Sequence, residues 1–326
     1  MSRSLSRFVL GIALVLPTLC FAADPDPAWP SRPVTIITPG DAGGVLDIRA
    51  RWLAERLTPL LGQSVLVDNR AGSGGSIGTQ AGARSPADGH TMTLIHLGTM
   101  AINPHLYARL GYDPLADFIP ITRISGGPLL LVVHPSVKAG SLAELIGLAK
   151  AQPGQLNFGS AGIGTPGHLA SELFKRSAAL DVVHVPYKGG AQAVSALLAG
   201  QIAFMAENPS VLLQHVASGR LRALAVTGPT RLKSLPEVPT TAEAGSPELE
   251  LVAWTGVAVP AGTPKPVVDR IYREVRDLMT TPKATEWLDL IGSYPRTDSP
   301  ETFARVIRAD HAKWGKVIRD AGIRLE

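Results

Sequence analysis

The sequence predicts an α/β protein of two lobes, each built around a wound sheet. Short apolar runs typical of buried strands alternate with longer runs of helical periodicity, which is the pattern of strands joined by crossover helices. The composition breaks at 125–128, where a second series of this kind opens, and a strand-like run at 249–259 leads back toward the first series. Because about 300 residues exceed what one hydrophobic core usually serves, two lobes joined by a hinge are expected.

The first lobe is expected to contain, in order, a strand at 34–37, a glycine-rich turn at 39–44, a helix at about 47–61, a strand at 65–67, a second glycine-rich turn at 72–76 and a strand at 91–95. The apolar residues of the helix fall near one face, and Asp47 is well placed to cap its N-terminus. Thr99 follows the third strand at its carboxyl end. Sheets of this type bind ligands there, so Thr99 is a candidate contact.

The second lobe is expected to contain strands at 129–133, 156–158, 182–185, 202–205 and 224–226, helices at 142–152, about 167–178 and up to about 198, a third glycine-rich turn at 157–165 and a turn at 186–190. The run at 249–259 then returns to the first lobe, and the tail ends in helices. The predicted division is therefore 23–126 and 252–326 for the first lobe and 127–251 for the second.

The N-terminus predicts a signal peptide at 1–22 with cleavage after Ala22, because a basic start precedes a short apolar run at 8–16. A membrane anchor is one alternative, but about nine apolar residues are too few to cross a bilayer, which needs roughly 20. A lipoprotein signal is another, although Leu19 stands before Cys20 where such signals carry a small residue. The signal peptide predicts a secreted protein.

Composition argues against nucleic acid as a partner. The formal net charge is +4, and two of these charges come from arginines of the predicted signal peptide. Aromatic residues make up 5% of the chain and form no stripe with basic residues. The chain has one cysteine, Cys20, which signal-peptide cleavage would remove, so the mature chain would need no disulfide.

Three glycine-rich turns predict how a ligand is held. Each follows a predicted strand and opens a predicted helix, and glycine lets the backbone pass close to a ligand. The first N–H groups of a helix have no acceptor within the helix, so such a turn can hold a carboxylate or phosphate without a cationic side chain. The second turn lacks the acidic residue of a dinucleotide fingerprint and is interpreted as packing. The first and third turns are therefore expected to bind a small anion.

No catalytic constellation accompanies these turns in the sequence. The eight histidines show no HExxH-type or comparable spacing, so neither a metal nor another cofactor is expected. Ser160 lies in a turn that lacks the first glycine of a nucleophile elbow. A non-enzymatic binding protein is therefore the preferred interpretation, and a hydrolase that uses Ser160 is the alternative.

Seven motifs follow one another along the chain after the signal peptide. They are Gly43-Gly44-Val45-Leu46-Asp47 with Arg51; Asp68-Asn69-Arg70 with Gly72-Ser73-Gly74-Gly75-Ser76-Ile77-Gly78; Asn103-Pro104-His105-Leu106-Tyr107; Tyr112-Asp113-Pro114; 157–165; His184-Val185-Pro186-Tyr187-Lys188-Gly189; and Leu235-Pro236-Glu237-Val238-Pro239-Thr240 with Glu243-Ala244-Gly245. Together they resemble the periplasmic solute receptors of tripartite tricarboxylate transporters, also called the Bug family, over essentially the whole mature chain.

The resemblance implies a two-lobed periplasmic-binding-protein fold of the Venus-flytrap, type II-like kind, with two hinge crossings. It implies a periplasmic receptor that closes on a small mono- or dicarboxylate and delivers it to an inner-membrane permease. Carried over residue by residue, the resemblance places Gly43, Gly44 and Val45 on one wall of the cleft and Ser160, Ala161, Gly162 and Thr165 on the other.

The chain departs from the family pattern at several cleft positions. Gly40 stands where an aromatic residue is usual, and Asp41 stands where a proline or similar residue is usual. Ala206 takes the place of an aspartate that could meet a ligand's amino group, so an organic acid is expected in preference to an amino acid. Glu207 beside it is a candidate contact that would need an amine or hydroxyl opposite. Tyr187 is a further candidate, as an aromatic edge.

The membrane partner stays open at this point. The same two-lobed clamp would serve a signalling receptor that docks on a sensor kinase, because transport and signalling both need a closed form that a membrane protein recognises.

Overall fold

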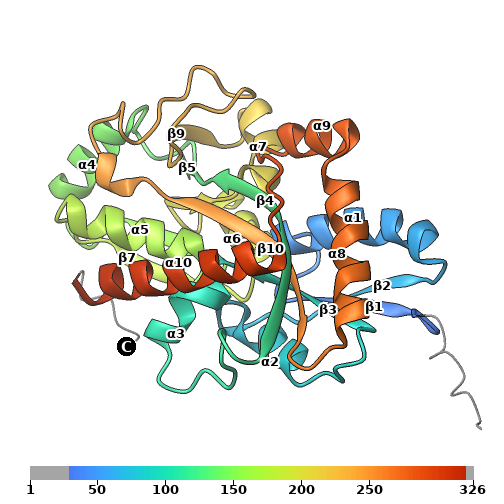
Figure 1. Ribbon diagram of the computed structural model, residues 1–326. Helices are drawn as coiled ribbons and strands as arrows, with labels where there is room; N and C mark the ends of the chain where they lie inside the picture. The colour runs from blue at the N-terminus through green and yellow to red at the C-terminus, as the bar shows by residue number, and fades with distance from the viewer. Residues whose placement is uncertain (1–28, 321–326) are drawn as a thin grey trace, which may run out of the picture.

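Two mixed sheets of five strands organise the chain (Figure 1). The computed structural model describes residues 29–320, so the predicted signal peptide lies outside the described residues. The first sheet has the order β2-β1-β3-β10-β4, made of β1 (Val34–Thr38), β2 (Val65–Asn69), β3 (Thr91–His96), β4 (Phe118–Pro128) and β10 (Val252–Pro260). The second has the order β7-β6-β8-β5-β9, made of β5 (Leu130–Val133), β6 (Asn157–Ser160), β7 (Val183–Pro186), β8 (Phe204–Glu207) and β9 (Arg222–Val226).

Helices connect and cover the strands. The α-helices are α1 (Val45–Leu61), α2 (Ser76–Ala83), α3 (Asn103–Leu106), α4 (Leu142–Ala151), α5 (Pro166–Ser177), α6 (Gly190–Leu198), α7 (Leu213–Ala217), α8 (Lys265–Met279), α9 (Pro282–Leu290) and α10 (Pro300–Asp320). Short 3-10 turns are η1 (Ser73–Gly75), η3 (Pro209–Val211) and η4 (Pro247–Leu249), and η2 (Gly98–Ile102) is a π-helical turn. Within residues 29–320, no helix is both long enough and apolar enough to cross a membrane.

The two sheets share one arrangement. In the first, β2, β1 and β3 are parallel, and β10 pairs with β3 and β4 in antiparallel fashion. In the second, β7, β6 and β8 are parallel, and β5 pairs with β8 and β9 in antiparallel fashion. The predicted α/β class with one sheet in each lobe is confirmed. The loops that follow the parallel strands leave each sheet at its carboxyl edge, where open α/β sheets bind ligands.

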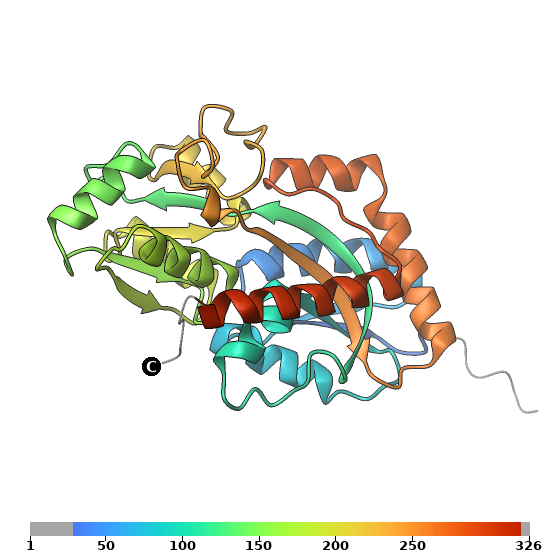
Figure 2. The ribbon, with the colours of Figure 1, turned by 60° about the vertical axis from the view of Figure 1, so that its left-hand side comes forward.

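The chain changes sheets twice. β4 ends at Pro128 in the first sheet and β5 begins at Leu130 in the second. The return lies between η4, which ends at Leu249, and the start of β10 at Val252. Figure 2 shows the paired strands β4 and β10 leading from one lobe toward the other. The predicted division at 126/127 and 251/252 stays an interpretation of these crossings.

Each lobe has its own apolar packing. Two clusters of buried side chains lie mainly in the first lobe and two lie in the second. In the first lobe, Trp52 of α1 stacks on Trp287 of α9 with ring centroids 4.5 Å apart. Such a pair adds about 0.5–1.5 kcal/mol beyond the area that it buries. The pair holds α1 against α9.

One strand was not predicted, and one expectation about local structure was wrong. The segment at 118–128 is strand β4, whose Gly126 and Gly127 pair with β10 and leave room for the segment at 293–294. Asp47 is not the N-cap of α1, since Gly44 holds that position. Asp47 lies in the first turn of the helix instead, and its carboxylate reaches back to accept the Gly43 N–H at 2.8 Å.

Candidate ligand-binding site

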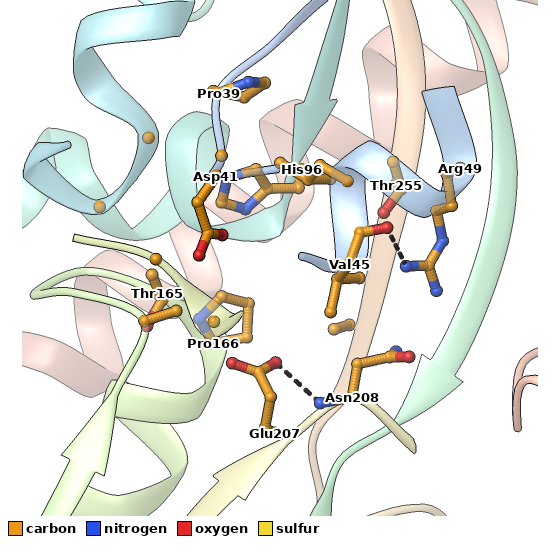
Figure 3. Close-up of a pocket in the computed structure, with 18 of the residues that line it drawn as sticks. Pro39, Asp41, Val45, Arg49, His96, Thr165, Pro166, Glu207, Asn208 and Thr255 are labelled. Carbon is orange, nitrogen blue, oxygen red and sulfur yellow. Dashed lines mark hydrogen bonds between the residues drawn. The ribbon is translucent and has the colours of Figure 1, made fainter. Parts of the chain in front are cut away.

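A cavity lies between the two lobes, where the loops after the parallel strands of both sheets converge (Figure 3). The space between its lining atoms, open mouth included, is about 770 Å³. The lining residues include Pro39, Gly40, Asp41, Val45, Leu46 and Arg49 from the β1–α1 segment; Gly74, Gly75 and His96; Ala161, Thr165 and Pro166 from the β6–α5 segment; Lys188, Gly189 and Gly190; Glu207 and Asn208; and Ser125, Trp254 and Thr255 from the paired strands.

The first wall is the turn between β1 and α1. Its backbone is fixed by two bonds: the Gly44 N–H donates to the carbonyl of Asp41, and the Gly43 N–H donates to the carboxylate of Asp47. Val45 and Leu46 open the helix, and N–H groups in the first turn have no acceptor within the helix. These two amides therefore favour a negative charge at this side of the cavity.

A buried guanidinium also reaches this wall. Arg49 is one helical turn beyond Val45 and only 2% exposed. It donates to Ser125 Oγ at 2.9 Å, Ser293 Oγ at 3.0 Å and the carbonyl of Val45 at 3.1 Å, which leaves two of the five guanidinium N–H donors. Among the described residues, no carboxylate forms an ion pair with it. Burial lowers the pKa of Arg49 to about 10, so the side chain stays charged at neutral pH.

Arg49 is not among the residues expected from the sequence, because the anion was expected to need no cationic side chain. The spacing between Arg49 and Val45, the first residue of α1, is the sequence feature that would have indicated Arg49. A cation four residues after the first residue of a helix projects from the same face as that first residue. An arginine at that place, on a helix opened by a glycine-rich turn, combines a charged donor with the free amides of the helix start.

The second wall is the turn between β6 and α5. Thr165 is the N-cap of α5, since its Oγ1 accepts the N–H of His168 at 3.4 Å and its hydroxyl donates to the carbonyl of Gly162 at 2.8 Å. The Gly162 N–H donates to Ser160 Oγ at 3.2 Å. Several polar groups that were expected to meet a ligand are therefore already paired within this turn.

A third helix start faces the cavity at α6. Asp41, from the first lobe, accepts the N–H of Ala191 through Oδ2 at 3.0 Å. Gly189, the N-cap of α6, provides no side-chain cap of its own. The tip of a helix in one lobe is thus capped by a carboxylate from the other lobe.

A buried carboxyl group forms the floor of the cavity on the second-lobe side. Glu207, at the end of β8, is 7% exposed, and its Oε1 accepts the N–H of Asn208 at 2.7 Å. Burial raises the pKa of Glu207 to about 7, with the charge of Asp41 acting in the same direction. The Asn208 N–H and the charge of Arg49 act against this rise. Glu207 is therefore only partly ionised at neutral pH.

His96, at the end of β3, adds a neutral ring to the lining. Burial lowers its pKa to about 4, and the charge of Arg49 acts in the same direction. Its Nδ1 accepts the N–H of Gly98 at 3.0 Å, which fixes the ring orientation.

The lobes touch each other around the cavity. The hydroxyl of Tyr107 in the first lobe donates to the carbonyl of Ile163 in the second at 3.0 Å. Gly74 approaches the same carbonyl so closely that a methyl group at Gly74 would overlap its oxygen, and its φ of +59° is a conformation that favours glycine. The glycine turn interpreted as packing therefore packs against the opposite lobe and also lines the cavity. The two lobes are therefore in direct contact beside the cavity.

The structure divides the ten predicted contact residues into two groups. Val45, Ala161, Thr165 and Glu207 line the cavity, whereas Gly43, Gly44, Thr99, Ser160, Gly162 and Tyr187 lie outside its lining. Which of the ten touches a ligand stays a prediction.

The residues outside the lining have identifiable surroundings. Gly43 is exposed on the turn. Thr99 is buried and its hydroxyl donates to the carbonyl of His96. Ser160 is fully buried, and Tyr187 lines a separate surface hollow beside Ala42. Arg49, His96 and Asn208 line the cavity but were not selected from the sequence.

Ser160 shares a hydrogen bond of 2.7 Å with His184 Nε2, which is the contact that a serine hydrolase would need. Ser160 is 0% exposed and lies outside the cavity lining, however, so a substrate in the cavity would not meet its hydroxyl. A nucleophile must reach the reacting carbon at close to van der Waals distance. The geometry therefore does not favour the hydrolase alternative.

His184 also belongs to a cluster with His168 and Glu172, whose potential ligand atoms lie within 4.8 Å of one another. This grouping was not expected from the sequence, because only the fold brings His184 of β7 beside helix α5, which carries the other two residues. One nitrogen of each ring is already hydrogen-bonded: His184 Nε2 to Ser160, and His168 Nδ1 to the Gly164 N–H at 3.3 Å. The His168 and His184 rings also pack with centroids 4.5 Å apart. The cluster fits a packed polar network better than an open coordination site.

Comparison with known proteins gives consistent results. The family model described as "Tripartite tricarboxylate transporter family receptor" matches residues 49–323. The chain is 36% identical to Protein BugT of Bordetella pertussis over 319 residues, which covers 98% of each chain.

Solved structures of similar proteins share the fold. R. palustris Rpa4515 with adipate superposes with a TM-score of 0.88 at 38% identity, covering 91% of this chain and all of the other. MatC (Rpa3494) from Rhodopseudomonas palustris with bound malate superposes with a TM-score of 0.85 at 28% identity, covering 89% of this chain and all of the other. The predicted periplasmic-binding-protein architecture is confirmed by these matches.

Proposed function

The chain belongs to the tripartite tricarboxylate transporter receptor family, also called the Bug family, and we propose that it closes its two lobes on a small carboxylated solute and delivers that solute to a membrane permease. The observation that carries the proposal is the buried Arg49 at the cavity, beside the helix start of α1. A buried guanidinium without a carboxylate partner among the described residues is costly, and an anionic ligand would supply that partner.

Hydrogen bonds from Arg49 and the α1 amides are sufficient for binding of a carboxylate in the micromolar range. A hydrogen bond to a charged group contributes about 1.5–3 kcal/mol. Three or four such bonds from Arg49 and the α1 amides, less the cost of ordering the ligand, could reach the roughly −8 kcal/mol of a micromolar complex. Both lobes line the cavity, so the closed form gains ligand contacts that an open form lacks. Ligand binding would therefore shift the population toward closure.

We also propose that the protein binds its solute without changing it chemically. The supporting observation is that Ser160, the candidate nucleophile, lies outside the cavity lining. We place the mature protein in the periplasm, on the strength of the predicted signal peptide and of membership in a receptor family. The family description names a transporter, which favours a permease over a sensor kinase as the membrane partner. The adipate and malate bound to the similar proteins favour an organic acid as ligand.

The test is a thermal-shift screen of small mono- and dicarboxylates, including adipate and malate, followed by calorimetry. A ligand at 100 times its Kd should stabilise the protein by about 2.7 kcal/mol. Arg49→Lys keeps a charge but loses the planar fork, and should weaken binding about tenfold or more. Arg51→Lys is the matched control, because it makes the same change on the same helix at an exposed residue, and a lysine there can still pair with Asp47. A panel without any stabilising carboxylate, or equal affinities of the wild type and Arg49→Lys, would refute the proposal.

A further inference from the structure

Asp41 occupies a place that would otherwise suit an anion from solution. Its carboxylate accepts the N–H of Ala191, in the first turn of the nine-residue helix α6. Helix starts favour negative charge, and a carboxylate that accepts an amide there forms a charge-assisted bond. The partners are 150 residues apart in the chain and belong to different lobes. The bond therefore forms only when the lobes are together.

The tip of α6 has room for this carboxylate. A methyl group at Gly189 would overlap the carboxylate of Asp41. Gly189 has a φ of −176°, which any residue adopts, so its backbone conformation does not require glycine. The space that glycine leaves is filled by Asp41. Helix α6 is thus built to receive a carboxylate at this point, and the protein supplies one itself.

The same end of the cavity holds a second carboxyl group. A methyl group on Gly190 would stand 3.6 Å from Glu207 Oε2. Gly190 follows Gly189, the residue that faces Asp41. Figure 3 shows the carboxyl groups of Asp41 and Glu207 pointing toward the same space on one side of Val45, with Arg49 on the other side. Lys188 also lines the cavity here but is exposed, so water and salt screen its charge.

The cavity therefore has a cation on one side of Val45 and two acidic groups on the other. Resting on the function proposed above, we infer that it selects a solute with a single carboxylate, held at the Arg49 end, and a hydroxyl or ammonium donor at the other end, held by Asp41 and Glu207. A second carboxylate at that end would meet two acidic groups, and like charges brought together oppose binding. Asp41 is the specificity-determining residue in this arrangement, because it fills the helix tip that a second carboxylate would use.

The test is calorimetry of the mature chain with two matched series of acids at pH 7.5. The six-carbon series is hexanoate, 6-hydroxyhexanoate, 6-aminohexanoate and adipate. The four-carbon series is butanoate, 4-hydroxybutanoate, 4-aminobutanoate and succinate. In at least one series, the wild type should bind the hydroxy or amino acid about tenfold or more tightly than the dicarboxylate. The hydroxyl and ammonium arms identify which donor is used. Asp41→Asn keeps an oxygen acceptor for Ala191 but removes the charge, so it should raise dicarboxylate affinity about tenfold.

The control is Asp68→Asn, which removes the same charge outside the cavity, where Asp68 pairs with Arg70. It should leave every affinity unchanged. Dicarboxylates that bind the wild type as tightly as the donor-bearing acids would overturn the inference. So would an Asp41→Asn variant with the wild-type order of affinities. Either result would leave a carboxylate receptor standing. Failure of all acids in both series would overturn this inference, whereas the proposed function falls only if the wider carboxylate panel also fails.

Discussion

The pH dependence of stability should reveal the buried carboxyl group of Glu207. Its ordinary pKa is 4.5, and burial raises the value to about 7 in the folded protein. Between these two values, the unfolded chain has released the proton while the folded chain retains it, so stability falls as pH rises. The fall is 1.36 kcal/mol for each pH unit, or about 3 kcal/mol over the whole interval. Above about pH 7.5 the loss is complete and the curve levels.

The assay is urea unfolding of the wild type and of Glu207→Gln at half-unit steps from pH 4.5 to 8. The glutamine keeps an oxygen that accepts the Asn208 N–H and does not titrate. The difference between the two free energies of unfolding isolates Glu207, because the buried histidines titrate alike in both proteins. Relative to the wild type, Glu207→Gln should gain about 3 kcal/mol between pH 4.5 and pH 8. A difference that stays constant with pH would refute the reasoning.

Three more results follow from the structure. Gly74→Ala places a methyl group on the carbonyl of Ile163 in the other lobe, so it should weaken binding of the tightest acid about tenfold or more in calorimetry. Gly219→Ala is the control and should bind normally, because Gly219 has a similar φ of +70°, open space around it and no place in the cavity lining. Thr165→Val removes the N-cap of α5 and should cost about 1 kcal/mol in urea unfolding, whereas Thr165→Ser should not, and equal losses would contradict the capping role. Burial lowers the pKa of His184 from 6.5 to about 4, so the contribution of this side chain to stability is complete above pH 6.5 and is lost as pH falls. The midpoint temperature of thermal unfolding should therefore change less steeply with pH between pH 6.5 and 4 in His184→Gln than in the wild type. The same slope in both proteins would contradict this reasoning.

Local patterns were sufficient for most of the secondary structure. The strand predicted at 34–37 is β1, and the helix predicted at about 47–61 is α1, which begins at Val45. Apolar periodicity and turn residues act within a few positions of the chain, so they can be read without the fold. The strand that was not predicted, β4, lies where tertiary contacts override local preference. Gly126 and Gly127 belong to β4 because the β10 ladder pairs with them, although glycine normally weakens a strand.

The candidate site was only partly predictable. Val45 and Thr165 follow from strand–turn–helix connections, and the structure places both at the cavity. Backbone amides alone were expected to hold the anion, so Arg49 was not predicted. The burial of Arg49 depends on Ser125 and Ser293, which lie far from it in the sequence. The cost of burying a charge, and the partner that offsets it, can be judged only when the surroundings are known.

The sequence by itself determined the alternation of strands and helices, the order of the glycine-rich turns and the family, since these depend on residues close together in the chain. Tertiary structure decided which charges share the cavity. Asp41 meets helix α6 across 150 residues, and Arg49 and Glu207 reach the same space from different lobes. Electrostatic interactions depend on distance in space and on exclusion of water, and both are fixed only when the two sheets bring their carboxyl edges together.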